Sequence, residues 1–113
     1  MAARNHLLEA PPYPVEQALR RLGANLRTAR IRRSLTIDEV AAKIGTGPRA
    51  VMDAEKGKAS TGIATYTALL WVYDLLQPFE SLADPAGDAE GLSLAMARER
   101  TRVRRSGGLD NDF

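Results

Sequence analysis

The stretch "LTIDEVAAKIGTGPRAVMDAEKG", residues 35–57, carries the pattern of two short helices separated by a glycine-containing turn. Thr36 is followed three residues later by Glu39, which is the spacing of a capping box. In a capping box the hydroxyl and the carboxylate accept hydrogen bonds from the first free amides of a helix. The sequence therefore predicts a helix that begins at Ile37.

The turn between the two helices is marked by glycine and proline. Gly45 suits the left-handed backbone conformation that commonly follows a helix, because glycine has no Cβ atom. Gly47 can serve as an N-cap, and Pro48 has the fixed φ angle of a first helical position. We expect the second helix to run from Pro48 to about Lys56, so that the two helices form a helix-turn-helix unit.

A longer helix is expected before this unit. Three prolines in "EAPPYP", residues 9–14, mark a loose entry segment, so the helix should begin after Pro14 and end near Arg33. Its apolar residues recur at steps of three and four, the period of a helix with one buried face. They are Val15, Leu19, Leu22, Leu26 and Ala29.

Two more helices are expected after the unit. Ser60 or Thr61 can cap the first of them. Its core-facing residues are Leu69, Leu70, Val72, Tyr73 and Leu76. The stretch "PFESLADP", residues 78–85, predicts a short fifth helix with Phe79 and Leu82 facing inward. The expected fold class is therefore all-α, a compact five-helix domain.

The chain divides into three expected parts. Residues 1–14 form a flexible N-terminal segment, residues 15–85 form the helical domain, and residues 86–113 form a C-terminal basic tail. A chain of 113 residues with 44% hydrophobic residues suits one core. The tail contains good helix formers but only a thin apolar stripe, so we expect it to be solvated and mobile when alone.

The composition limits the possible chemistry. The sequence has no cysteine and one histidine, His6, which excludes a disulfide, a clustered metal site and a histidine-based catalytic triad. It also lacks a glycine-rich phosphate loop, so we expect neither enzyme activity nor a cofactor. No apolar run approaches the roughly 20 residues of a membrane span, and the N-terminus lacks the apolar region of a signal peptide. We therefore expect a cytoplasmic protein without a membrane partner.

Charge is unevenly distributed, although the net charge is only +2. Residues 15–35 hold six arginines and one acid, whereas residues 61–97 hold five acids and no lysine or arginine. Residues 98–105 are again basic, with five arginines and one acid. Such asymmetry indicates separate surfaces for separate partners, one of which could be nucleic acid. A basic face that is merely solvated is the alternative interpretation.

From Leu22 to Leu76, about half of the chain, the sequence resembles the Cro/C1-type family of helix-turn-helix proteins, also called the XRE family, which includes phage and bacterial repressors. The matching positions are Leu26, Arg30, Leu35-Thr36, Glu39-Val40-Ala41, Ile44-Gly45, Val51 and Glu55-x-Gly57. The resemblance implies a Cro/C1-repressor-like fold with an ion pair between Arg30 and Glu55. It also implies a transcriptional repressor that binds a double-stranded DNA operator as a homodimer.

By the same resemblance, the third helix lies in the major groove and reads base edges. The implied DNA-binding residues are Thr36, Ile37, Thr46, Gly47, Pro48, Arg49, Met52, Asp53, Lys56 and Lys58. Arg49 can donate two hydrogen bonds to guanine or clamp a phosphate, Met52 can touch a thymine methyl group, and Asp53 can accept from a cytosine amine. Many family members carry glutamine where this chain has Ile37, which cannot donate to a phosphate. Affinity for DNA must therefore come from elsewhere, such as helix N-termini, the lysines and the basic tail.

Residues 68–92 resemble a narrower group of the family, the HipB-like antitoxins encoded beside HipA-like kinases, through a leucine-tryptophan pair and an "LADP" element. This resemblance implies an antitoxin that represses its own operon and binds a HipA-like toxin kinase. The acidic region could face such a partner. The aromatic residues of the region are expected in the core or in a dimer interface, because a small domain buries its few aromatic side chains. They are Trp71, Tyr73 and Phe79.

The arginines of the tail leave three interpretations open: a clamp on DNA, a segment that folds on the toxin or on a second protomer, or a plain solubilising terminus. These arginines are Arg98, Arg100, Arg102, Arg104 and Arg105. The main alternative function is a protein-protein interaction module that uses the helix-turn-helix as a scaffold without strong DNA binding. Ile37, Pro48 and Asp53 favour this alternative, because none of them adds a donor for DNA.

Overall fold

A computed structural model describes residues 5–110, with side chains to residue 105, and every regular element in this range is helical. The all-α prediction is therefore confirmed. Contacts divide the chain into two units, with the boundary between Glu80 and Ser81. The elements of the first unit are α1 (His6–Glu9), α2 (Tyr13–Arg32), α3 (Ile37–Ile44), α4 (Pro48–Glu55), α5 (Ile63–Val72) and α6 (Gln77–Glu80). Those of the second are the 3₁₀ helix η1 (Pro85–Gly87) and α7 (Ala89–Asp110).

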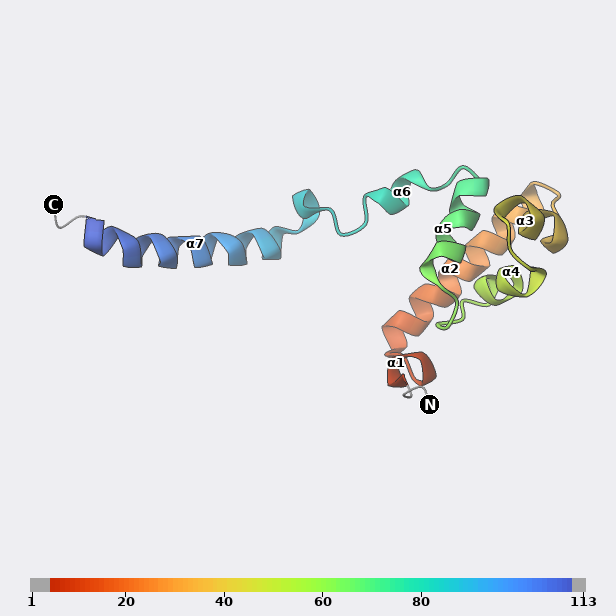
Figure 1. Cartoon of the computed structure of the whole chain (residues 1–113), viewed down its shortest axis with the longest axis horizontal. Helices are drawn as coiled ribbons and strands as arrows, with labels where there is room; N and C mark the ends of the chain where they lie inside the picture. Colours follow the sequence, from red (N-terminus) through yellow and green to blue (C-terminus); the bar gives the residue numbers. More distant parts are fainter. Residues whose placement is uncertain (1–4, 111–113) are drawn as a thin grey trace. The chain divides into compact units, whose positions relative to one another are not determined.

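In the first unit, α3 and α4 follow one another across a short turn, and α4 packs against α2, α3 and α5 (Figure 1). The core lies where these four helices meet. Its buried residues are Leu26, Ala29, Val40, Ala41, Val51, Ala54, Tyr66, Leu69 and Tyr73. Three of them are alanines, one each from α2, α3 and α4, and small side chains let helix backbones approach closely. The helix-turn-helix segment therefore forms part of the core itself.

The capping box, the glycine turn and the first-turn proline predicted within residues 36–48 are all present in the structure. The amide of Glu39 donates to Thr36 Oγ1 at 3.1 Å, and the amide of Thr36 donates to Glu39 Oε1 at 3.0 Å, which completes the capping box. These hydrogen bonds lower the pKa of the Glu39 carboxyl group below its ordinary value. Gly45 follows α3 with a φ angle of 78°, and Pro48 opens α4 after the N-cap Gly47. Short-range sequence therefore determines where both helices begin.

Two glycines allow α2 and the end of α4 to meet backbone to backbone. A Cβ atom on Gly23 would lie 2.6 Å from the carbonyl oxygens of both Ala54 and Glu55. A Cβ atom on Gly57 would lie 2.6 Å from the carbonyl carbon of Leu19, and Gly57 also has a φ angle of 71°. Since real Cβ atoms do not approach this closely, no other residue fits at either position without moving a helix.

Two helix starts differ from the predicted ones. α2 begins at Tyr13, ahead of the expected start after Pro14, because a proline within the first turn of a helix lacks only an N–H that has no intrahelical partner there. α5 begins at Ile63 after the N-cap Gly62, so the prediction that Ser60 or Thr61 caps this helix is wrong. In the N-terminal segment, Asn5 caps the single turn of α1, and residues 1–4 lie outside the described range.

The predicted fifth helix over residues 78–85 is replaced by two short elements, α6 and η1. Between them Ala83 has a φ angle of 58°, so the chain leaves the helical path. Asp84 then caps η1 by accepting from the amide of Ala86 at 2.9 Å. Leu82 is 68% exposed, and the expectation that it faces inward is wrong.

The second unit contains a long helix in the segment expected to form the C-terminal basic tail. α7 extends from Ala89 to Asp110, and Asp88 accepts from the amide of Gly91 at 2.9 Å in its first turn. Alanine, leucine, arginine and glutamate are strong helix formers. Their propensity accounts for the helical backbone, although the segment has only a thin apolar stripe for packing. The described side chains of α7 are nevertheless mostly exposed. The exposure agrees with the expected solvation of this segment, its mobility stays a prediction, and residues 111–113 lie outside the described range.

Replacing Gly57 by alanine should destabilise the first unit strongly. The new methyl group would clash with the backbone of α2, and residue 57 would have to keep a left-handed conformation that alanine rarely adopts. Together these two effects should lower the free energy of unfolding by about 3 kcal/mol or more. Chemical denaturation followed by circular dichroism measures this loss. Gly62→Ala is the matched control, because no atom lies within 4 Å of its Cβ position and its φ angle is −67°. Equal denaturation midpoints for the two variants would contradict the close approach of α2 and α4.

Candidate nucleic-acid interface

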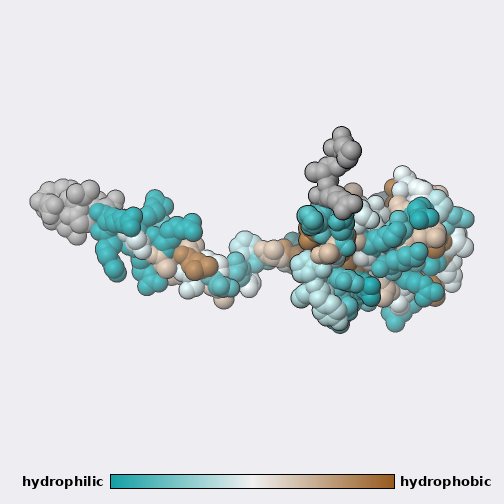
Figure 2. All heavy atoms as spheres, turned by 90° about the horizontal axis from the view of Figure 1, so that it is seen from below, coloured by the Kyte–Doolittle hydropathy of each residue, from teal (hydrophilic) through white to brown (hydrophobic). Residues whose placement is uncertain are grey.

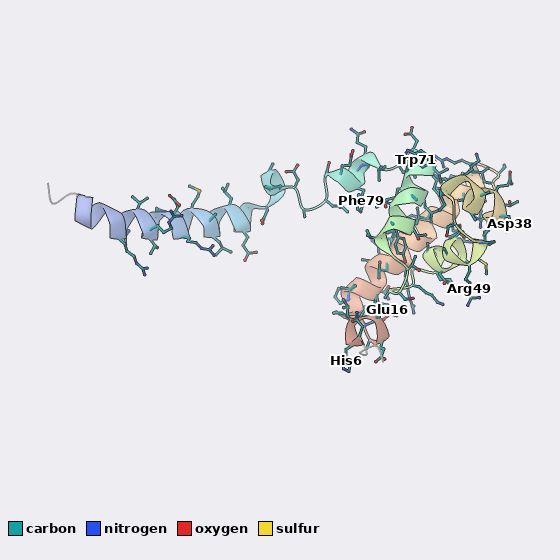
Figure 3. All side chains as sticks on the ribbon, viewed as in Figure 1. His6, Glu16, Asp38, Arg49, Trp71 and Phe79 are labelled. Carbon is teal, nitrogen blue, oxygen red and sulfur yellow. The ribbon has the colours of Figure 1, made fainter. Side chains whose placement is uncertain are left out.

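The outer side of α4 carries the residues that the resemblance assigns to base reading. Val51 and Ala54 are fully buried and fix one side of the helix against the core. On the other side the Arg49 side chain is 78% exposed, and it points away from the packed helices (Figure 3). Met52 is also exposed, whereas the side chain of Asp53 is only 21% exposed. The structure thus brings Arg49, Met52 and Asp53 together on one short helix.

The other residues of the predicted set surround α4. Thr36 and Ile37 lie at the start of α3, and Ile37 is half-buried against the core, so its side chain supports the fold. Thr46, Gly47 and Pro48 form the turn and the first position of α4, and Gly47 provides no side-chain cap there. Lys56 and Lys58 follow α4 and are exposed.

The segment after α4 is held by backbone and side-chain hydrogen bonds. The amide of Lys58 donates to the carbonyl oxygen of Asp53 at 3.1 Å, and the Tyr66 hydroxyl of α5 donates to the carbonyl oxygen of Lys58 at 2.8 Å. Burial raises the pKa of the Tyr66 hydroxyl, so this donor stays protonated in the physiological range. The position of Lys58 relative to α4 is therefore set by the fold.

A carboxylate lies among the cations of this face. Asp53 Oδ1 lies 3.5 Å from Arg49 Nε and 3.4 Å from Lys58 Nζ. Neither contact has hydrogen-bond geometry, and among the described residues no donor hydrogen bonds to this buried oxygen. Two of the three cations on the face are thus partly neutralised by the protein itself.

The end of α4 is fixed by an ion pair with α2. Arg30 donates from Nε to Glu55 Oε2 at 2.7 Å and from Nη2 to Glu55 Oε1 at 3.0 Å, which is a bidentate arrangement. Arg30 Nη1 also donates to the carbonyl oxygen of Leu35 at 2.9 Å. The side chains are 13% and 7% exposed, and the hydrogen bond to Glu55 raises the pKa of Arg30 despite its desolvation. The ion pair that the resemblance implies is therefore present in the structure.

A second arginine, which sequence analysis left unassigned, links α2 to the end of α5. Arg33 donates to the carbonyl oxygens of Ala29 at 3.0 Å and of Tyr73 at 2.9 Å. Its guanidinium carbon also lies 5.5 Å from the centroid of the Tyr73 ring, within cation-π range. A basic residue just after a helix can donate hydrogen bonds to the free carbonyl groups of the last turn. The position of Arg33 directly after α2 was therefore the feature of the sequence that could have indicated this role.

The three aromatic residues of the acidic region have different environments. Tyr73 is fully buried in the core, and burial raises the pKa of its hydroxyl. Phe79 is half-buried in α6. Trp71 is 62% exposed and lies on a different side of the first unit from Arg49 (Figure 3). Trp71 therefore lies outside the core of the single chain, because the helical register of α5 turns it outward while Tyr66, Leu69 and Tyr73 turn inward, and its place in a dimer interface stays a prediction.

The tail arginines lie on α7, where all five are exposed. Arg102 contacts Glu99 at 3.4 Å. Figure 2 shows hydrophilic residues over most of this helix, with a smaller hydrophobic patch. Among the described side chains of α7, the large apolar ones that are more than half exposed are Leu92, Leu94, Met96 and Val103. α7 thus presents both cations and apolar side chains to solvent.

The chain was compared with known proteins at three levels, and no family model, curated protein or solved structure matches it. In the part of the chain that the structure describes, histidine, aspartate and glutamate form no group of three or more that could hold a metal ion. Over the same residues, no helix is long and apolar enough to cross a membrane.

Removing Arg30 should be far more costly than removing an exposed arginine of the same helix. Arg30→Met leaves Glu55 as an unpaired, largely buried charge, and it should lower the free energy of unfolding by about 3 to 5 kcal/mol. Arg20→Met is the matched control, since Arg20 pairs with Glu16 at 2.8 Å with both side chains substantially exposed, and such pairs contribute about 1 kcal/mol or less. Urea denaturation of both variants measures the difference. Similar losses would show that the Arg30 pair is no more important than a surface pair.

Proposed function

We propose that this protein is a sequence-specific DNA-binding transcriptional repressor with a Cro/C1-type helix-turn-helix domain. The observation that carries the proposal is the arrangement of α4: its inner side is buried by Val51 and Ala54, and its outer side exposes Arg49 and Met52. A helix fixed on one side and open on the other can enter the major groove without rearrangement. In this proposal α4 faces the bases and α3 packs on the side of α4 away from them. The protein is proposed to act in the cytoplasm.

Each exposed group on this face has a chemical use on DNA. The guanidinium group of Arg49 can donate to guanine O6 and N7, and Met52 can contact a thymine methyl group. Lys56 and Lys58 follow the helix and can contact phosphates. The first turn of α4 has no side-chain cap; Pro48 has no N–H and the Ala50 amide donates to the carbonyl oxygen of Gly47 at 3.3 Å, which leaves the Arg49 amide for a phosphate oxygen. The arginines of α7 offer further phosphate contacts.

The alternative is a protein-protein interaction module on the same scaffold. Two observations favour it: Ile37 packs against the core at the start of α3, and Asp53 neutralises part of the charge of Arg49 and Lys58. The two functions differ in their dependence on salt. DNA binding weakens steeply as salt rises, because phosphate neutralisation releases counterions, whereas a protein-only module has no duplex affinity to lose.

Dimerisation fits the exposed side of α5. Ile63 and Trp71 lie two helical turns apart on one side of this helix, and both are more than half exposed. Large exposed apolar side chains of this kind are typical of an interaction surface. In this proposal two copies pair through Trp71, as operators with two half-sites require.

The proposal extends to an antitoxin that represses its own operon and binds a HipA-like toxin kinase. The acids of residues 61–97 are all exposed, as a surface for a basic partner would require. Two of them also have local structural roles, since Asp84 caps η1 and Asp88 accepts from the first turn of α7. Binding of the purified chain to the kinase encoded beside it would test this part separately from DNA binding.

The first test is a titration of the full chain against a duplex from upstream of its own gene, at several salt concentrations, with a scrambled duplex alongside. We expect tighter binding to the upstream duplex and a steep loss of affinity with salt. Equal affinity for the two duplexes at every salt concentration would favour the protein-interaction module.

Arg49→Ala should weaken binding to the upstream duplex by about 1 to 3 kcal/mol and relax preference at one base pair, because it removes a base-edge contact. Lys56→Ala is the comparison: loss of a phosphate contact should weaken binding to all duplexes alike and reduce the salt slope by about 1. Fluorescence anisotropy on a panel of single-base-pair variants of the duplex measures both effects. An Arg49→Ala profile parallel to that of Lys56→Ala would remove Arg49 from base reading.

Trp71→Ala should convert a dimer into a monomer while leaving the fold of the single chain stable. Since Trp71 is mostly exposed in that chain, we expect a change of less than about 1 kcal/mol in the unfolding free energy of the monomer. Sedimentation equilibrium measures the mass. Tyr13→Ala removes another exposed aromatic side chain, 71% exposed on α2, and should leave the dimer intact. A Trp71→Ala variant that is still dimeric would place the interface elsewhere.

A further inference from the structure

The most unusual feature of the α4 face is a carboxylate with two cations and no hydrogen-bond donor. Asp53 Oδ1 is buried, lies within 3.5 Å of Arg49 Nε and within 3.4 Å of Lys58 Nζ, and receives no hydrogen bond from the described residues. A buried charged oxygen of this kind is costly unless nearby charges compensate it. Asp53 therefore depends on both cations staying close to it.

The contact with Arg49 involves one particular edge of the guanidinium group. The shortest contact of the pair joins Asp53 Oδ1 to Arg49 Nε, and among the described residues no nitrogen, Arg49 Nη1 and Nη2 included, donates a hydrogen bond to this oxygen. These terminal nitrogens are the fork that can donate to two acceptors at once, such as O6 and N7 of guanine. Because Arg49 and Asp53 are one helical turn apart, the pair also restricts the rotamers of the arginine.

The contact with Lys58 has a different effect. The backbone of Lys58 is placed by three hydrogen bonds, with Asp53, Thr61 and Tyr66, and its ammonium group lies 3.4 Å from Asp53 Oδ1. A lysine that faces a carboxylate at 3.4 Å contributes less to the attraction of phosphates than a free lysine. Asp53 thus lowers the attraction of this face for any DNA, whatever its sequence.

We infer that Asp53 is a positioning residue that exchanges general affinity for specificity: it aims the Arg49 fork at a guanine and screens Lys58 from phosphates. This inference rests on the proposed function and deepens it. It replaces the expectation that Asp53 accepts a hydrogen bond from a cytosine amine, because the side chain is mostly buried and already faces two cations.

Asp53→Asn is the main test, because it removes the charge with almost no change in shape. We expect its affinity for the scrambled duplex to rise several-fold, with a salt slope steeper by about 1, since Lys58 is freed for a phosphate. The ratio of upstream to scrambled affinity should fall about tenfold, the scale of one bidentate base contact. Thermal unfolding of the variant shows whether the fold is kept.

Asp53→Glu separates charge from position. It keeps the negative charge but moves the carboxylate by one methylene group, so we expect low affinity for the scrambled duplex together with a lost preference for guanine. A double-mutant cycle with Arg49→Lys adds a direct measure of coupling. Lysine keeps the charge of Arg49 without the fork, so residues 49 and 53 should be coupled on the upstream duplex and independent on the scrambled one.

An unchanged affinity ratio in Asp53→Asn would overturn the inference. A loss confined to one C·G pair, with scrambled binding unchanged, would also overturn it and return Asp53 to direct base reading. If the parent chain binds no duplex, the proposed function fails, and the Arg49–Asp53 contact is then tested in the free protein. There, the NMR signal of the Arg49 Nε–H should shift and exchange faster with water in Asp53→Asn, and an unchanged signal would overturn the contact.

Discussion

The ion pair between Arg30 and Glu55 joins three parts of the chain at one point. The same guanidinium group holds the end of α4 through the carboxylate and the segment before α3 through the carbonyl oxygen of Leu35. Both helices of the helix-turn-helix unit are therefore positioned relative to α2, and the pair is shielded enough from water to be directional. The exposed face of α4 has a defined orientation because its far end is held in this way.

This rigid support contrasts with the modest charge of the face it presents. Few cations lie there, and one carboxylate sits among them, so attraction to the phosphate backbone is limited. A reader of this kind would need dimerisation or the arginines of α7 to reach useful affinity, while its own contacts supply discrimination. Such a division of tasks would suit a repressor whose occupancy of its operator is adjusted by a partner protein. A small change in avidity would then change operator binding substantially.

The elements that depend on neighbouring residues were predictable from the sequence, and those that depend on distant packing were not. The capping box of Thr36 and Glu39, the left-handed Gly45 and the first-turn Pro48 each act within a few residues, so their patterns fixed α3 and the start of α4 in advance. The tight fit of Gly23 involves α4, about 30 residues away along the chain, and periodicity carries no sign of it. Trp71 shows the same limit, because α5 is apolar on all sides and its composition does not indicate which side is buried. The charge of Asp53 was visible, but its contacts with Arg49 and Lys58 needed coordinates.

The contact of Gly23 and Gly57 between α2 and α4 is made by main-chain atoms. A Cβ atom at position 23 or 57 would meet backbone atoms, so the seat of α4 on α2 requires glycine at both positions, in addition to the Arg30–Glu55 pair and the buried side chains of α4. The outer positions of α4 can then be exchanged without altering the way the helix is mounted. In the DNA-binding function proposed above, the residues that mount α4 are thus separate from those that would read bases, and a new operator could be acquired by changing outward side chains on an unchanged frame.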